Sequence, residues 1–262
     1  MAAMNKVLDL VLRTAGPCFF MGMQVASLTT AYRIFTSRTT GQLSALPFMS
    51  LMTNSVLWTM YGALKDDYTV MVPNFTGSLA GILCVYVYHV NSSVETYNNE
   101  TRYFYIGAAA IITFGLACSY YNDYEMIGTL GVIMCVILMG SPLAVLRTVL
   151  TERNCNAMPF WTSLATWCNT FSWAMYGLID AKDFMIYFPN LIGLALASVQ
   201  MILFAVFGIP ANDRFWLPTK SVVATSVISQ TFKGPLIPVR TVYQPLSSDF
   251  PAVKTSYGSD RK

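Results

Sequence analysis

The chain has few charged residues. Asp, Glu, Lys and Arg make up 11% of its 262 positions, whereas a typical soluble domain has about 25%. The chain is 55% hydrophobic, with a mean hydropathy of +0.50. Its uncharged residues gather in stretches close to the ~20 residues that a helix needs to cross a bilayer, so we predict a protein embedded in a lipid bilayer. The net charge of +3 is small and scattered, which argues against a nucleic-acid partner.

Motifs for catalysis, metal binding and nucleotide hydrolysis are also missing. The single histidine is His89, and the six cysteines form no C-x-x-C pair. We therefore expect no metal, no cofactor and no histidine-dependent reaction. No G-x-x-x-x-G-K-[ST] sequence is present, so ATP-driven pumping has no support. Together these absences favour a protein that is not an enzyme.

Seven hydrophobic stretches are long enough to be transmembrane helices. They cover about residues 11–32, 45–64, 69–89, 103–120, 125–146, 159–179 and 185–208. Acidic and basic residues are absent from the middle of these stretches. Proton or ion coupling normally needs such a group within the membrane, so any transport is expected to be uncoupled and downhill.

The sequence N-x-x-x-W-x-M-Y-G followed by D-x-x-x-x-x-P-N occurs twice, at residues 54–74 and 169–190. The copies are about 115 residues apart, and the second has one extra residue between its two halves. A duplicated membrane unit is typical of transporters whose site lies between the repeats. The motif therefore predicts a transporter.

The position of the copies predicts four parts: a first repeat (1–90), a linker helix with its loops (91–124), a second repeat (125–208) and a polar, proline-rich tail (209–262). The tail is expected to be disordered. Three helices leave the chain on the opposite side of the membrane, and the linker helix returns it, so the repeats run parallel. We predict an all-α membrane protein with seven transmembrane helices, arranged as two parallel three-helix bundles around a linker helix (3-1-3).

Six polar or aromatic residues of the motif are expected at similar depths in the four motif helices. By helical rise, one layer contains Trp58, Asn74, Trp173 and Asn190. Asn54 and Asn169 lie one turn further in, on the same faces as the tryptophans. Indoles can stack on the apolar face of a sugar ring, and amides offer uncharged donors and acceptors to its hydroxyls. This layer suits a small sugar. Interfacial tryptophans and helix-joining asparagines are the simpler alternatives.

Tyrosines and aspartates mark the outer end of the same helices. Tyr61 and Tyr176 lie one turn above the tryptophans, while Asp67 and Asp183 begin the following helices. A tyrosine of one repeat can reach an aspartate of the other and close an extracellular gate. The aspartates can also serve only as N-caps, and the two roles are compatible.

Prolines fall near the opposite, cytoplasmic ends of the helices. Pro47 and Pro159 occupy first helical turns, where proline is ordinary. Pro142 lies within the stretch 125–146, so it is the better candidate for a hinge. Short connections carry nearly equal numbers of Lys and Arg on the two sides. Arg214 and Lys220 behind the last helix favour an extracellular N-terminus and a cytoplasmic C-terminus.

The order and spacing of these motifs resemble the SWEET sugar transporters, a family with parallel repeats. The resemblance covers nearly all of residues 10–208 and includes W-x-M-Y-G, D-x-x-x-x-x-P-N, S-P-L at 141–143 and M-P-F at 158–160. The run at residues 61–65 is closer to animal and protist members than to plant ones. The resemblance implies a 3-1-3 bundle that performs bidirectional sugar uniport by alternating access.

The resemblance also implies residue roles. The family's substrate-lining positions correspond to Trp58, Asn74, Trp173 and Asn190. Its outer gate corresponds to Tyr61 and Asp183. Its cytoplasmic proline tetrad corresponds to Pro47, Pro142, Pro159 and Ser27, the last departing from the plant pattern. Many plant members have a smaller residue at the position of Trp58. Two indoles narrow the pocket, which favours a hexose such as glucose over sucrose.

Other interpretations of the sequence remain open. A related PQ-loop carrier for another small neutral solute would share the repeat, although the chain contains no Pro-Gln dipeptide. A seven-helix receptor does not explain the duplication, and a scaffolding protein does not explain the polar layer. One chain holds both repeats, so a homo-oligomer is open but not required. The plasma membrane is the expected location, with an endomembrane as the alternative.

Overall fold

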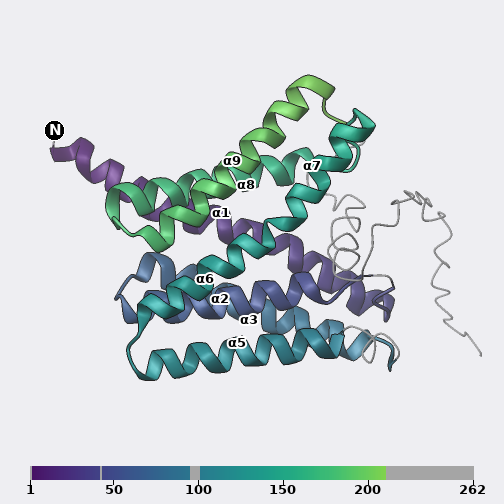
Figure 1. The fold of residues 1–262 in the computed structure, drawn as a ribbon, viewed down its shortest axis with the longest axis horizontal. Helices are drawn as coiled ribbons and strands as arrows, with labels where there is room; N and C mark the ends of the chain where they lie inside the picture. Colours follow the sequence, from purple (N-terminus) through teal and green to yellow (C-terminus); the bar gives the residue numbers. More distant parts are fainter. Residues whose placement is uncertain (1, 42, 95–100, 211–262) are drawn as a thin grey trace, which may run out of the picture.

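The computed structural model describes residues 2–41, 43–94 and 101–210 (Figure 1). Its elements are α1 (Ala2–Ser37), α2 (Leu46–Leu64), α3 (Tyr68–Asn91), α5 (Arg102–Tyr120), α6 (Tyr124–Leu138), α7 (Gly140–Glu152), α8 (Phe160–Met175), the π-helical turn η2 (Tyr176–Asp180) and α9 (Phe184–Phe207). Every regular element in these described ranges is helical. The tail predicted at 209–262 lies outside the described residues except for its first two positions.

The helices alternate in direction and give seven spans when α6 and α7 are counted as one. Four helical segments are long and apolar enough by themselves to cross a membrane: α3, α5, α6 with α7, and α9. The motif helix α2 has three adjacent polar residues, Thr53, Asn54 and Ser55, near its middle, and α8 is polar at several positions and only 16 residues long. A helix that faces a polar site can carry such residues because neighbouring helices shield them from lipid.

The stretch 125–146, expected as one helix, is divided. Helix α6 ends at Leu138, Met139 is a turn, and α7 starts at Gly140. Pro142 explains the break, since it has no N–H to donate and its ring clashes with the carbonyl four residues earlier, that of Leu138. Helix α1 differs from expectation in another way. It begins at Ala2, so Arg13 lies three turns inside it rather than close to an end.

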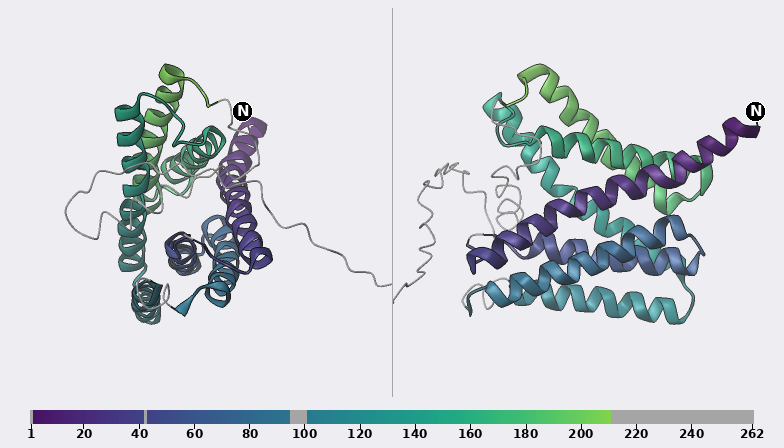
Figure 2. Two further views of the ribbon diagram at one scale, coloured as in Figure 1. Left: turned by 90° about the vertical axis from the view of Figure 1, so that its right-hand side faces the viewer. Right: turned by 180° about the vertical axis from the view of Figure 1, so that it is seen from behind.

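The two repeats are intertwined through their first helices. In Figure 1, α1 and the α6–α7 pair run diagonally with opposite slopes, and Figure 2 shows them on opposite faces of the molecule. Helix α1 packs against α3 of its own repeat and α8 of the other, while α6 packs against α9 of its own repeat and α2 of the other. Helix α5 lies at the periphery against α2 and α6. This arrangement encloses a space between the repeats.

The three turns at one end of the bundle are built alike. Each has a residue with positive φ, namely Asp66, Asn122 or Lys182, followed by an aspartate. The aspartates are the N-caps of α3, α6 and α9, and their carboxylates accept hydrogen bonds from Val70, Met126 and Met185 N–H groups. An N-cap carboxylate satisfies an otherwise unpaired N–H and complements the helix dipole. The motif aspartates are thereby held rigidly at this end.

Candidate functional site

Two tyrosine–aspartate hydrogen bonds cross between the repeats at the end where these turns lie. Tyr61 donates its hydroxyl to Asp183 Oδ2 at 2.7 Å. Tyr176 donates to Asp67, with its hydroxyl 2.8 and 2.9 Å from the two carboxylate oxygens. Tyr61 and Tyr176 are each 2% exposed. The same two aspartates cap α3 and α9, so capping and the contact between repeats occur together.

The extra residue of the second motif copy is taken up by the π-helical turn. In the first repeat, Lys65 N–H donates to the Tyr61 carbonyl four residues earlier. In the second, Ala181 N–H donates to the Tyr176 carbonyl five residues earlier. A π turn accommodates one additional residue within a helix and leaves the flanking structure intact. Asp183 therefore occupies the place in the second repeat that Asp67 occupies in the first.

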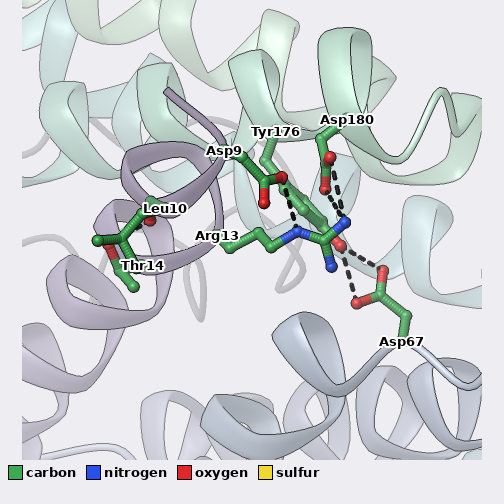
Figure 3. A network of polar contacts seen from close by, with 7 residues as sticks. All are labelled: Asp9, Leu10, Arg13, Thr14, Asp67, Tyr176 and Asp180. Carbon is green, nitrogen blue, oxygen red and sulfur yellow. Dashed lines mark hydrogen bonds and ion pairs between the residues drawn. The ribbon is translucent and has the colours of Figure 1, made fainter. Parts of the chain in front are cut away.

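Three ion pairs flank these contacts, and they differ between the repeats. Lys65 Nζ is 2.7 Å from Asp183 Oδ2, in a carboxylate that is 7% exposed. Arg13 pairs with Asp9 on its own helix and with Asp180 in η2, both at 3.0 Å. Figure 3 shows Arg13 beside the Tyr176–Asp67 contact. Lys65 corresponds to Ala181, since each donates its N–H to the carbonyl of the motif tyrosine, so the cation of the first repeat has no charged counterpart in the second.

A cavity of about 150 Å³ lies between the repeats below this closed end. Ten residues line it: Phe20, Asn54, Trp58, Val70, Asn74, Cys135, Asn169, Trp173, Ile186 and Asn190. All six residues of the predicted polar and aromatic layer are among them. The ten form five pairs at corresponding positions of the two repeats, 115 residues apart before the π insertion and 116 after it. The cavity thus has approximate two-fold symmetry.

The cavity offers little charge. No Asp, Glu, Lys, Arg or His is among the ten described residues that line it. Nor do the described ranges contain a group of three or more His, Cys, Asp or Glu residues arranged for a metal ion. The lining offers aromatic faces, amides, aliphatic groups and one thiol.

Each indole lies against a glycine of the opposite repeat. A Cβ at Gly16 would stand 3.0 Å from Trp173, and one at Gly131 would stand 3.1 Å from Trp58. Each indole also meets a motif tyrosine edge-on, with ring centroids 5.4 Å apart for Trp58 and Tyr61 and 5.8 Å for Trp173 and Tyr176. Edge-to-face rings attract one another. A ligand that moves an indole therefore acts directly on the tyrosine above it.

The asparagines of α3 and α9 use their amides in the same way. Asn74 Nδ2 donates to the Val70 carbonyl at 2.8 Å, and Asn190 Nδ2 donates to the Ile186 carbonyl at 2.7 Å. One of the two hydrogens of each amide nitrogen is thus used by its own helix. The amide oxygen, which can accept two hydrogen bonds, is the atom that can accept from a hydroxyl group in the cavity.

A family model described as "Sugar efflux transporter for intercellular exchange", MtN3_slv, matches residues 11–95 and 125–212. The chain belongs to this family, the MtN3/SWEET family. Its members are transporters rather than enzymes, and they are integral membrane proteins. The two matched segments correspond to the two repeats and omit the whole of α5. The match therefore agrees with a 3-1-3 division of the chain.

Individual SWEET proteins show the same relationship. The chain is 28% identical to bidirectional sugar transporter SWEET2b of Oryza sativa subsp. indica, over 74% of this chain and 87% of that protein. It is 27% identical to bidirectional sugar transporter SWEET17 of Arabidopsis thaliana, over 70% and 78%. A structure of a eukaryotic SWEET transporter matches with a TM-score of 0.66 and 25% identity, covering 76% of this chain and 95% of that one. The predicted fold is confirmed.

The four predicted hinge positions of this SWEET chain have different local structures. Pro47 is in the first turn of α2, and Pro159 is the N-cap of α8. Pro142 follows the break between α6 and α7. Ser27 is the counterpart of Pro142 in the first repeat, and α1 continues through it without interruption. The first helices of the two repeats therefore differ in stiffness at corresponding positions.

Four residues around the SWEET cavity were not predicted, two of them outside the motif and two at its unspecified positions. Phe20, Val70, Cys135 and Ile186 line it. Phe20 and Cys135 are 115 residues apart, as the tryptophans are, but their residue types differ, so the repeat does not single them out. The same holds for Arg13 and Lys65, whose corresponding positions also hold different residue types.

Proposed function

We propose that this chain is a facilitative, uncoupled and bidirectional sugar uniporter, and that its substrate is a hexose such as glucose. The single observation that supports this most is the cavity between the repeats, where paired indoles and paired amides meet without a charged side chain. Indole faces suit the C–H surface of a pyranose, and amides suit its hydroxyls. A charge-free lining gives no place for a coupled proton or ion.

In this proposal the sugar lies between Trp58 and Trp173, and Asn74 and Asn190 accept hydrogen bonds from its hydroxyls. Asn54 and Asn169 contribute further polar contacts deeper in the cavity. The cavity volume of about 150 Å³ is below the ~300–1,000 Å³ typical of pockets for drug-sized ligands. This size favours a single sugar ring over a disaccharide.

Alternating access requires the two ends of the pathway to open in turn. The Tyr61–Asp183 and Tyr176–Asp67 contacts form the extracellular gate, which is closed in this conformation. Pro142 with Pro47, Pro159 and Ser27 form the cytoplasmic hinge. Downhill transport needs both conformations populated, so the gate contacts must not stabilise the closed state by more than a few kcal/mol.

The cellular setting is also part of the proposal. We place the chain in the plasma membrane, with the N-terminus outside and the C-terminus in the cytoplasm. Residues 1–90 and 125–208 form the repeats, 91–124 the linker, and 209–262 a tail that lies almost wholly outside the described residues. The cavity is complete within one chain, so transport does not depend on a homo-oligomer.

Counterflow of radiolabelled glucose in proteoliposomes tests the proposal. Wild type should exchange glucose without an ion gradient, and Trp173→Ala and Asn190→Ala should reduce the exchange at least tenfold. Trp161→Ala is the matched tryptophan control, since Trp161 lies on the same helix but is 40% exposed. Asn91→Ala is the amide control, since Asn91 also donates to the carbonyl four residues earlier but lies at the end of α3.

Three outcomes would contradict parts of the proposal. If glucose exchange survives both Trp173→Ala and Asn190→Ala, the chain is still a sugar transporter, but the sugar binds elsewhere. Sucrose exchange at rates comparable to glucose would contradict the hexose assignment. Absence of exchange with every sugar tested, from folded protein, would favour a carrier for another small neutral solute.

A further inference from the structure

The two-fold symmetry of the cavity is broken chemically at one pair of lining residues. Four of the five pairs are identical or nearly so: Asn54 with Asn169, Trp58 with Trp173, Val70 with Ile186, and Asn74 with Asn190. The fifth pair is Phe20 in α1 and Cys135 in α6. A symmetric cavity would accept an asymmetric sugar in two orientations of equal energy. Phe20 and Cys135 are therefore the residues that can distinguish those orientations.

The difference between Phe20 and Cys135 gives the deeper amides, Asn54 and Asn169, different hydrogen-bond partners. Cys135 Sγ donates a hydrogen bond to Asn54 Oδ1 at 3.5 Å, so this oxygen has a partner from the other repeat. By repeat correspondence, Phe20 occupies the place beside Asn169 that Cys135 occupies beside Asn54. A phenyl ring has no polar hydrogen to donate. Among the described residues none provides a hydrogen-bond partner for Asn169 Oδ1, which is buried.

An unpartnered buried acceptor is unfavourable, and a ligand hydroxyl can relieve it. Asn169 borders the cavity. A half-turn of its amide group would exchange the positions of Oδ1 and Nδ2, and it would break no hydrogen bond to Oδ1, because this atom accepts none from the described residues. The same movement of Asn54 would break its contact with Cys135. The two amides are thus unequal in their readiness to bind a ligand, although their sequences and positions correspond.

We propose that Phe20 and Cys135 set the orientation of the bound sugar, with Asn169 binding a sugar hydroxyl while Asn54 stays paired with Cys135. Phe20 then contacts the less polar edge of the ring. This inference rests on the proposed sugar transport and adds to it the orientation in which the sugar binds. It makes Cys135 a positioning residue that acts through Asn54, and it makes Phe20 a determinant of substrate orientation.

The test compares the two amides in different backgrounds by measuring KM for glucose counterflow. In the wild-type background, Asn169→Ala should raise KM about tenfold and Asn54→Ala less than about threefold, as expected for one hydrogen bond gained or already occupied. In the double variant Phe20→Cys/Cys135→Phe the order should reverse, with Asn54→Ala now the more damaging change. Equal effects of the two amides in wild type, or the same order in both backgrounds, would overturn the inference.

A conservative variant covers the case in which the exchanged pair does not fold. Cys135→Ala frees Asn54 without adding bulk, so Asn54→Ala should then raise KM as much as Asn169→Ala does. Cys118→Ala is the matched control, since Cys118 is a buried cysteine of α5 outside the cavity lining. An unchanged ratio in the Cys135→Ala background would overturn the inference while leaving sugar transport established. A wild type that exchanges no sugar would overturn both proposals.

Discussion

Gly131 lies directly behind the indole of Trp58, at a distance where a Cβ would stand 3.1 Å from the ring. The two residues belong to different repeats, and Gly16 and Trp173 form the corresponding contact. A glycine here lets the first helix of one repeat approach the tryptophan of the other. The two glycines therefore leave room for the indoles to lie back from the cavity, and this sets its width.

Alanine at either glycine should narrow the cavity. The added methyl group can be accommodated only if the indole moves by a few tenths of an ångström, and the open space lies on the cavity side. Overpacking of this kind costs about 1 kcal/mol or more, so Gly131→Ala and Gly16→Ala should each raise KM for the sugar about fivefold. The measurement is glucose counterflow over a range of concentrations.

The control is Gly107→Ala in α5, where an added Cβ meets nothing within 4 Å. Alanine is a better helix former than glycine by roughly 1 kcal/mol, so none of the three variants should lose stability through the backbone. An unchanged KM in both cavity variants would show that the indole positions do not limit binding.

The crossed tyrosine–aspartate contacts predict a shift in the conformational equilibrium. Tyr61→Phe and Tyr176→Phe each remove one hydrogen bond to a carboxylate, worth about 1.5–3 kcal/mol. Because the bond is present only when this end is closed, its loss should favour the conformation open at this end by about tenfold or more. The readout is the rate at which a membrane-impermeant thiol reagent modifies Cys135, with the other five cysteines replaced by alanine.

The matched control is Tyr120→Phe, since Tyr120 is 81% exposed and ends α5, directly before the turn that leads to Asp123. It should leave the modification rate unchanged. If Tyr120→Phe also speeds the modification of Cys135, or if neither gate variant speeds it, the crossed contacts do not control the opening of this end. Bound sugar should protect Cys135 in every variant, because the thiol lines the proposed site.

The ion pairs at this end should differ in their effect on stability. Lys65 compensates a nearly buried carboxylate, so Lys65→Gln should lower Tm by roughly 4–8 °C for about 2 kcal/mol. Arg13 is about half exposed in both of its pairs, and such pairs contribute about 0–1 kcal/mol. Arg13→Gln should change Tm by less than about 3 °C. Equal losses in thermal unfolding of the purified proteins would contradict this ranking.

Sequence patterns gave the helix positions well because hydrophobic length and the motif are both local signals. Five of the seven predicted spans agree with the observed helices to within a few residues, whereas 125–146 is divided into α6 and α7 and α1 extends well beyond 11–32. Helix α1 was underestimated because its first turns contain Lys6 and Asp9, which end a hydrophobic stretch without ending a helix. The break at Met139 depends on Pro142, whose effect differs between helix interiors and first turns.

The cavity was predictable to the extent that the repeat made it so. The motif identified six of the ten lining residues, whereas Phe20 and Cys135 lie outside it and differ in residue type, so the repeat did not mark them. The contact between Gly131 and Trp58 depends on how the repeats cross, and no local pattern encodes that crossing. The unequal state of Asn54 and Asn169 depends on residues from the opposite repeat, so it required the three-dimensional arrangement.

The π-helical turn η2 makes a prediction about chain length. The first repeat connects Gly62 to Asp67 with one residue fewer than the second needs between Gly177 and Asp183, and both aspartates reach corresponding places. Deletion of Ile179, which is 49% exposed in η2, should therefore convert the π turn to α-helical geometry. The protein should fold and retain sugar exchange within about threefold of wild type, since the change stays within ordinary surface effects of about 0.5 kcal/mol.

Deletion of Ala63, an exposed residue at the corresponding place in α2, is the matched control. The first repeat has no π turn to absorb the loss, because Lys65 already bonds to Tyr61 at α-helical spacing. The deletion must rotate the following residues by about 100° around the helix axis, which displaces Lys65 from Asp183. We expect loss of exchange and a lower Tm. Equal tolerance of both deletions would contradict the prediction, because it would mean that the register of the aspartates is unimportant for closing this end.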